Sequence, residues 1–233
     1  MLTLKTYRDL FYAKYRAWLL SRGVTSGANV EDVIPKEQVD EYLNLGWARV
    51  AEENRVIDSA RFHGLTSDPE IVIPNEENIF VVERIEVYRD GKLVRKCTIK
   101  PKSMLPADPD SETPGIPTLA AWSLTKHKDA PAELEIRLSP PANWDDDEGL
   151  FIYSYCRPDW LSDDDVEPEF PFLGMGKAGL NDALLQVTQD SKFNSLYEID
   201  LQPLYASGLT TQGGMKSVAS GTRPPDRSNL NSL

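Results

Sequence analysis

The sequence predicts an α+β fold: an N-terminal α-helical hairpin packed with an antiparallel β domain, then a further C-terminal helix and an extended C-terminal arm. Three patterns predict it. Apolar residues recur at helical spacing up to Val50, β-rich runs with a tight-turn signal follow, and the end of the chain has almost no large apolar side chain. The predicted parts are residues 1–66 (hairpin), 67–160 (β domain), 161–206 (acidic loop, helix and short strand) and 207–233 (arm).

Two amphipathic helices form the predicted hairpin. Their apolar stripes are Tyr7, Leu10, Phe11, Tyr15, Trp18 and Leu19 in the first, and Val39, Tyr42, Leu43, Trp47 and Val50 in the second. Residues 6–9 (Thr-Tyr-Arg-Asp) resemble a capping box, Gly23 is a stop signal, and Pro35 suits the start of the second helix. The aromatic side chains exceed what a small hairpin buries alone. We therefore expect them either to form a core with the β domain or to contact a neighbouring subunit.

The middle of the chain changes to strand-type patterns. Asp90-Gly91 is a strong two-residue hairpin signal between the first two of the predicted strands. These strands are residues 79–89, 92–100, 118–124, 133–138 and 150–156. No helical pattern separates them, so the sheet should be antiparallel. Residues 101–117 contain five prolines and are predicted to form a long ordered loop. Cys97 and Cys156 are expected to be buried and unpaired.

The C-terminal third begins with an acidic stretch. Residues 145–169 contain ten acidic side chains and one arginine, a net charge of −9 in a chain whose net charge is −12. This stretch is either a solvated face, a docking surface for a basic partner or a repulsive lining against DNA. The residues assigned to this electrostatic surface are Asp145, Asp146, Asp147, Asp163, Asp164 and Asp165. A helix over 179–189 and a strand over 196–201 are predicted next.

The arm over 207–233 lacks the apolar residues for a core of its own, so it is predicted to dock on another chain. Its local charge is +2, which suits an acidic groove on a partner protein or a sister subunit. The candidate docking residues are Met215, Lys216, Val218, Arg223, Arg227 and Leu230.

Sequence motifs give little support for an enzyme. Residues 174–179 (Gly-Met-Gly-Lys-Ala-Gly) match G-x-G-x-x-G, and Glu198 and Asp200 follow at about the spacing of a ribose-binding acid. The preceding residues 167–171 are acidic and broken by proline, however, whereas this motif requires a buried strand. We expect these glycines to form a flexible entry to the helix. His63 and His127 have no metal-ligand spacing, so no cofactor or metal is predicted.

The order of segments resembles the head-to-tail adaptor (connector or neck) proteins of tailed double-stranded DNA bacteriophages. The segments that carry the resemblance are PKEQVDEYLN (35–44), VERIEVYRDG (82–91), PTLAAW (117–122), LEIRLSPP (134–141) and LFIYSYCRP (150–158). In that family a strand ending in L-x-P-x-P precedes a strand with a trailing proline. Here Pro140-Pro141 takes the place of the spaced prolines, and Trp160-Leu161 lies near the usual trailing leucine.

The resemblance implies a structural virion protein at the head–tail neck, assembled in the host cytoplasm. Its partners would be the portal protein, sister subunits in a ring (usually a dodecamer) and downstream tail or nozzle proteins. DNA would be only a passing cargo, with no membrane, cofactor or enzymatic reaction involved. Two alternatives stay open: a β-rich carbohydrate-binding or tail-fibre-type module using Trp122, Trp144 and Trp160, and a hydrolase using Asp pairs.

Overall fold

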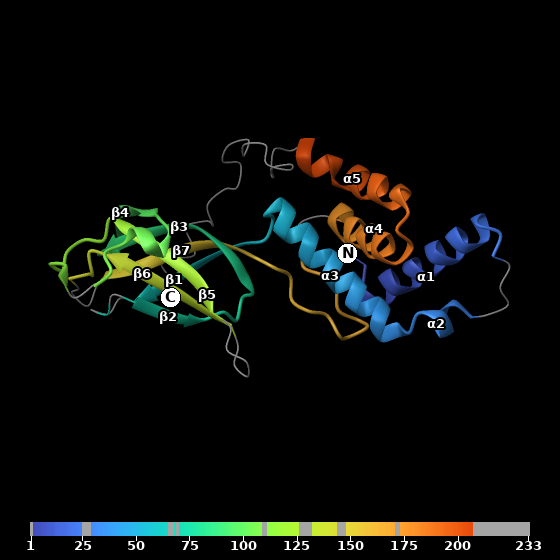
Figure 1. Ribbon diagram of the computed structural model, residues 1–233, viewed down its shortest axis with the longest axis horizontal. Coiled ribbons are helices and arrows are strands. Elements are labelled where there is room, and N and C mark those ends of the chain that lie inside the picture. The colour runs from blue at the N-terminus through green and yellow to red at the C-terminus, as the bar shows by residue number, and fades with distance from the viewer. Residues whose placement is uncertain are drawn as a thin grey trace. The chain divides into compact units, whose positions relative to one another are not determined.

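The computed structural model describes residues 2–24, 29–64, 68, 70–108, 111–125, 132–143, 148–170 and 173–206. Within them the chain forms two compact units (Figure 1). A helical unit contains the residues up to Ile57 and those from Arg157 onward, and a β unit spans Asp58–Cys156. The α+β prediction is confirmed. The predicted boundaries were wrong, because the β unit begins at Asp58 and the residues after Cys156 return to the helical unit.

The first helix, α1 (Leu4–Ser21), begins one turn earlier than predicted. Its N-cap is Thr3, whose hydroxyl accepts a hydrogen bond from the Thr6 amide at 3.3 Å. Gly23 terminates the helix as predicted, with a positive φ of 76°. The amides of Gly23 and Val24 donate to the carbonyls of Leu20 and Leu19, the two bonds of a Schellman motif.

Four further helices complete the described part of the helical unit. The short α2 (Val30–Val33) lies in the predicted polar loop, and α3 (Lys36–Asn54) begins directly after Pro35 as expected. The C-terminal pair is α4 (Leu173–Thr188) and α5 (Ser191–Ala206). The main helix contacts join α3 to α4 and α4 to α5. The residues of both predicted apolar stripes are buried or partly buried in a core formed within the helical unit.

Two predictions for the C-terminal helices were wrong. Residues 196–201 are helical, since the buried Phe193, Tyr197, Leu201 and Leu204 recur at the period of α5. Gly174–Gly179 is no flexible entry, because the whole motif lies inside the first turns of α4. The arm over 207–233 lies outside the described residues.

The β unit contains a seven-stranded sheet in the order β1-β7-β3-β4-β5-β6-β2. The strands are β1 (Asp58–Gly64), β2 (Glu70–Pro74), β3 (Ile79–Arg89), β4 (Lys92–Ile99), β5 (Leu119–Thr125), β6 (Glu133–Ser139) and β7 (Glu148–Cys156). Strands β1 and β2 were not predicted. Asp90 and Gly91 both have positive φ, as the predicted hairpin turn requires.

The sheet is not purely antiparallel. β4 and β5 pair in parallel, with Thr98 opposite Leu119 and Ile99 opposite Ala120. A parallel pair needs a long crossover, and the proline-rich loop between the two strands supplies it. The described part of this loop is ordered, as predicted. Arg137 donates a hydrogen bond to the Pro106 carbonyl, and the Ser139 hydroxyl lies 2.9 Å from Glu112 Oε1.

Candidate functional site

The structure describes only part of the predicted interaction surfaces. The docking residues Met215, Lys216, Val218, Arg223, Arg227 and Leu230, and the acidic residues Asp145, Asp146 and Asp147, lie outside the described residues. Asp163, Asp164 and Asp165 lie in the segment that enters the helical unit after the sheet. This segment, residues 157–170, is called the return segment below. It contains six acidic side chains and one arginine.

The return segment caps the N-terminus of α1 with its backbone. The amide of Leu4 donates to the Val166 carbonyl at 2.9 Å, and the amide of Lys5 donates to the Asp164 carbonyl at 3.1 Å. The first amides of a helix have no acceptor within the helix, so these two bonds satisfy groups that would otherwise need water. The path of the segment is therefore tied to the first turn of α1.

A buried asparagine fixes the same segment to α3. The side-chain nitrogen of Asn44 donates to the Leu161 carbonyl at 2.9 Å, and the Leu161 amide donates to the Asn44 side-chain oxygen at 2.8 Å. Leu161 and Phe170 are buried in the core of the helical unit. A buried amide with both of its groups paired is costly to disrupt, so the return segment is an integral part of this unit.

Asp164 belongs to an ion-pair network that sequence analysis missed. Arg8 is buried and donates to both carboxylate oxygens of Asp40, at 2.6 and 2.8 Å. The same guanidinium lies 2.8 Å from Asp164, and the Lys36 ammonium lies 3.0 Å from it. Hydrogen bonds from Arg8 and then Lys36 lower the pKa of Asp164 to about 2. Asp164 is thus a structural anion, and treating it as free surface charge was wrong.

Its two neighbours fit the predicted electrostatic surface better. Asp163 and Asp165 are exposed, and the Asp165 amide donates to the Asp163 carboxylate at 3.1 Å. Trp160 is 59% exposed in the same segment, and Val166 is also exposed. The return segment therefore presents an indole and carboxylates to solvent.

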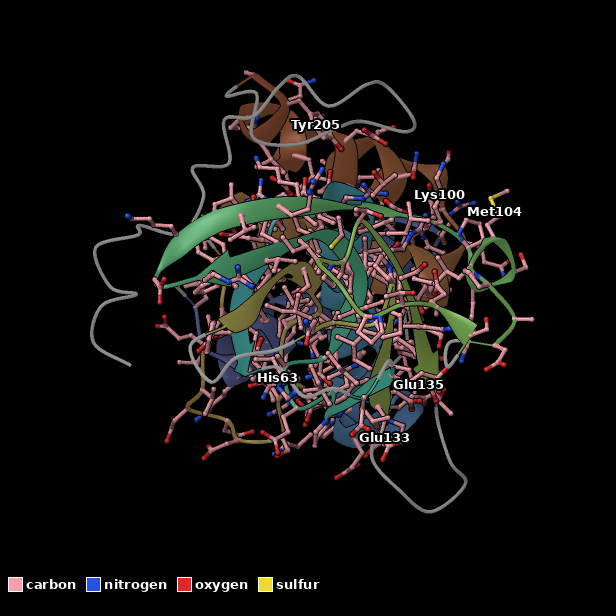
Figure 2. The ribbon with its side chains drawn as sticks, turned by 90° about the vertical axis from the view of Figure 1, so that its left-hand side faces the viewer. His63, Lys100, Met104, Glu133, Glu135 and Tyr205 are labelled. Carbon is pink, nitrogen blue, oxygen red and sulfur yellow. The ribbon has the colours of Figure 1, made fainter. Side chains whose placement is uncertain are left out.

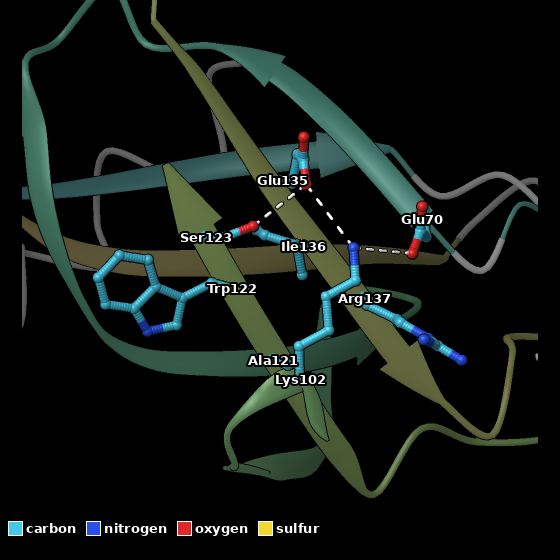
Figure 3. A pocket seen from close by; sticks show the side chains of 8 residues that line it. All are labelled: Glu70, Lys102, Ala121, Trp122, Ser123, Glu135, Ile136 and Arg137. Atoms are coloured by element: carbon cyan, nitrogen blue, oxygen red, sulfur yellow. Dashed lines mark hydrogen bonds and ion pairs between the residues drawn. The ribbon is translucent and has the colours of Figure 1, made fainter. Parts of the chain in front are cut away.

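The described hollow in the β unit does not favour the sugar-binding alternative. Its empty volume, open solvent included, is only about 180 Å³. The Lys102 ammonium lies 3.2 Å from Glu70 and 3.7 Å from Glu135, so these three charges are engaged with one another (Figure 3). Trp122 lines the hollow, but its indole points away from this cluster. Trp160 belongs to the helical unit, and Trp144 lies outside the described residues.

A charge cluster around the buried Glu86 of the sheet was also missed by sequence analysis. Glu86 Oε1 lies 3.1 Å from Arg84 Nε and 3.4 Å from Lys96 Nζ. The Tyr88 hydroxyl donates to Glu86 Oε2 at 3.1 Å. The pKa of this phenol is raised, mainly because the group is buried and secondly because the Glu86 carboxylate is negatively charged. Lys96 comes from β4 and the other three residues come from β3, so the Lys96–Glu86 contact joins the two strands. Removing either cation would leave a poorly compensated buried carboxylate.

The G-x-G-x-x-G motif is a helix-packing site. A Cβ atom on Gly179 would lie 2.2 Å from Trp47 Cδ1, and one on Gly176 would lie 1.9 Å from the Tyr7 hydroxyl. Trp47 Nε1 donates to the Gly176 carbonyl at 3.2 Å. The glycines thus give two aromatic rings access to the backbone of α4. Asp200, which has the spacing of a ribose-binding acid, lies in α5 and accepts a hydrogen bond from the Asn181 side chain on one carboxylate oxygen.

Other reactive groups in the described part of the chain have structural surroundings. Cys97 and Cys156 are buried and unpaired, as predicted, and burial raises the pKa of each thiol to about 11. His63 lies in β1, and its pKa is lowered mainly by burial and secondly by the positive charge of Arg61. His127 lies outside the described residues.

No three His, Cys, Asp or Glu side chains among the described residues are placed to share a metal ion. None of the described helices is long and apolar enough to cross a membrane. In Figure 2, His63 and Glu133 lie on the β unit and Met104 points away from it.

Comparisons with known proteins identify no family. No protein-family model matches the chain, and no curated protein does so either.

Proposed function

We propose that this chain is a structural virion protein, a head-to-tail adaptor that forms a ring, binds the portal and connects it to the tail. DNA would pass through the lumen of the ring as cargo. The neck of the virion would be its location, with assembly in the host cytoplasm. The partners would be the portal, sister subunits in a dodecamer and downstream tail or nozzle proteins.

The order of elements carries this proposal. α3 starts after Pro35, the β3–β4 hairpin turns at Asp90-Gly91, and β6 runs into Pro140-Pro141. β7 is then followed by Pro158. These elements lie in the segments that resemble the adaptor family. The helices and strands therefore begin and end in the segments that carry the resemblance, and they follow the order of those segments along the chain. This agreement supports the proposal.

The two-unit construction also supports a connecting role. Each unit is compact, and the polypeptide passes from the helical unit to the β unit and back. A connector needs separate surfaces for the portal, for its neighbours and for the tail. Two compact units in one chain can present such surfaces independently. We assign the portal contact to the helical unit and to the arm that follows α5.

The charge of the chain suits a channel for DNA. Exposed carboxylates such as Asp163 and Asp165 repel phosphates at short range, so an acidic lumen lets DNA slide without binding it. The overall charge of −12 likewise weakens non-specific binding of nucleic acid.

The test is an assembly experiment with a purified portal ring. The full chain should bind the portal as a second ring, visible by electron microscopy and measurable as added mass by sedimentation. A variant truncated after Ala206 is the matched control, because it keeps α5 and removes only the arm. If the full chain neither forms a ring alone nor binds the portal, the adaptor proposal is wrong. A monomer that binds sugars would instead favour the carbohydrate-binding alternative.

A further inference from the structure

The outer edge of β4 is unusual within the described sheet. β4 pairs with β3 from Lys92 to Cys97, but it meets β5 only at Thr98 and Ile99. Among the described strands, none pairs with the other side of residues 92–97. Their side chains up to Lys96 are all exposed, including Leu93 at 38% and Val94 at 39%. This edge therefore presents backbone groups and aliphatic side chains to a partner.

This β4 edge is basic in an acidic protein. Lys92, Arg95 and Lys96 give it three positive charges over five residues. Lys96 also lies 3.4 Å from the buried Glu86 carboxylate. Like charges oppose pairing between two identical edges. The same charges favour pairing with an acidic edge.

Strand β2 supplies an acidic edge of similar length. It is the last strand of the sheet and pairs only with β6 among the described strands. Val72 is 53% exposed, while Ile71 and Ile73 face the core. The surrounding charges are Asp68, Glu70, Glu76 and Glu77 against Arg61 and Lys102, a net of −2. The opposite end strand β1 contains one Asp and one Arg, so it lacks this complementarity.

We propose that the β4 edge of one copy pairs with the β2 edge of a second copy, so that the sheet continues from subunit to subunit. The inference rests on the proposed ring and names the contact that would build it. Because the two edges are different surfaces, the contact is heterologous, and repeating it generates a ring when the rotation closes. Backbone hydrogen bonds hold the strands, the charges select the partner edge, and Val72 packs beside Leu93 and Val94.

Site-directed cross-linking tests this pairing. Val72→Cys and Val94→Cys place thiols on the two edges, while the native Cys97 and Cys156 are buried. With a short bis-maleimide, the double variant should give a ladder of covalent multimers. An equimolar mixture of the single variants should stop at dimers, and each single variant alone should give none. Dimers from Val94→Cys alone would show β4 pairing with β4 and overturn the proposal.

Charge reversal gives an independent measurement. Lys92→Glu with Arg95→Glu should weaken self-association at least tenfold in sedimentation, and so should Glu70→Lys with Glu76→Lys. Combining both pairs should restore association. Lys96 is left unchanged because of its contact with Glu86. If the combined variant has a native circular dichroism spectrum but does not assemble, β2 is excluded as the partner edge. A ring without cross-links overturns this inference alone, whereas a chain that makes no ring and binds no portal overturns the adaptor proposal as well.

Discussion

Gly46→Ala should destabilise the helical unit, although alanine is the better helix former. A Cβ atom at position 46 would lie 2.3 Å from the carbonyl oxygen of Gly179. The next nearest atoms, at 3.1 and 3.3 Å, are also backbone atoms of Gly179. No side-chain rotation can relieve this overlap, so α3 and α4 must separate.

Two opposing effects set the size of the change. In a helix without neighbours, Gly→Ala would stabilise by about 1 kcal/mol. Here the helices would have to move apart by on the order of 1 Å, and such overpacking costs roughly 1–3 kcal/mol. The movement also strains the bond from Trp47 Nε1 to the Gly176 carbonyl, which is worth about 1 kcal/mol. The net prediction is a loss of roughly 1–3 kcal/mol.

Urea unfolding followed by far-ultraviolet circular dichroism measures this loss. Leu45→Ala is the matched control, because Leu45 adjoins Gly46 in α3 and is 42% exposed. Its unfolding free energy should change by less than about 0.5 kcal/mol. Gly64→Ala is a second control, since nothing lies within 4 Å of the added carbon. If Gly46→Ala is as stable as the wild type or more stable, the close α3–α4 approach is wrong.

The helical core, the Asp164 ion pairs and the C-terminal arm each make a separate prediction. Leu43 is fully buried, so Leu43→Ala should cost roughly 2–5 kcal/mol in urea unfolding. The pKa of Asp164 is lowered to about 2, so its stabilising effect is present above about pH 4 and is lost as the pH falls towards 2. Asp164→Asn should remove this acid dependence from a series of Tm measurements. Truncation after Ala206 should leave folding intact and abolish portal binding.

Each of these predictions has a contradicting outcome. If Leu43→Ala lowers the unfolding free energy by less than about 1 kcal/mol, the apolar stripe of α3 is exposed to solvent and not buried. Asp165→Asn is the control for Asp164→Asn, because Asp165 is exposed and lies one residue further on. Equal acid dependence in the two variants would exclude a special role for the Arg8 and Lys36 contacts. A truncated chain that binds the portal with unchanged affinity would refute the docking arm.

Local signals predicted the elements that depend on neighbouring residues. The span of β3 matches the predicted 79–89, and the turn at Asp90-Gly91 was found because positive φ at two residues strongly favours this pair. The start of α3 after Pro35 was predicted for a similar reason. In each case a restriction on one or two backbone angles is visible in the sequence itself.

Elements that depend on tertiary contacts were missed. β1 mixes charged, small and aromatic residues, so no alternation marks it, yet it pairs with β7 along its whole length. Residues 196–201 mix polar and apolar side chains too closely to separate a strand from a helix by period alone. Only the longer series from Phe193 to Leu204 shows the helical repeat that packs on α4.

The role of Asp164 and the conformation of the glycine motif were mispredicted for the same physical reason. The acidic run was treated as one electrostatic surface, but the charge of Asp164 is set by Arg8 and Lys36, more than a hundred residues away in sequence. The glycines of the G-x-G-x-x-G motif were treated as flexible, but Tyr7 and Trp47 occupy the space that their missing side chains leave. A short motif records which side chains are small or charged, while the contacts that give them a role come from other parts of the chain. Residues such as Gly176 and Gly179 should therefore be tested by packing variants before any ligand is sought for them.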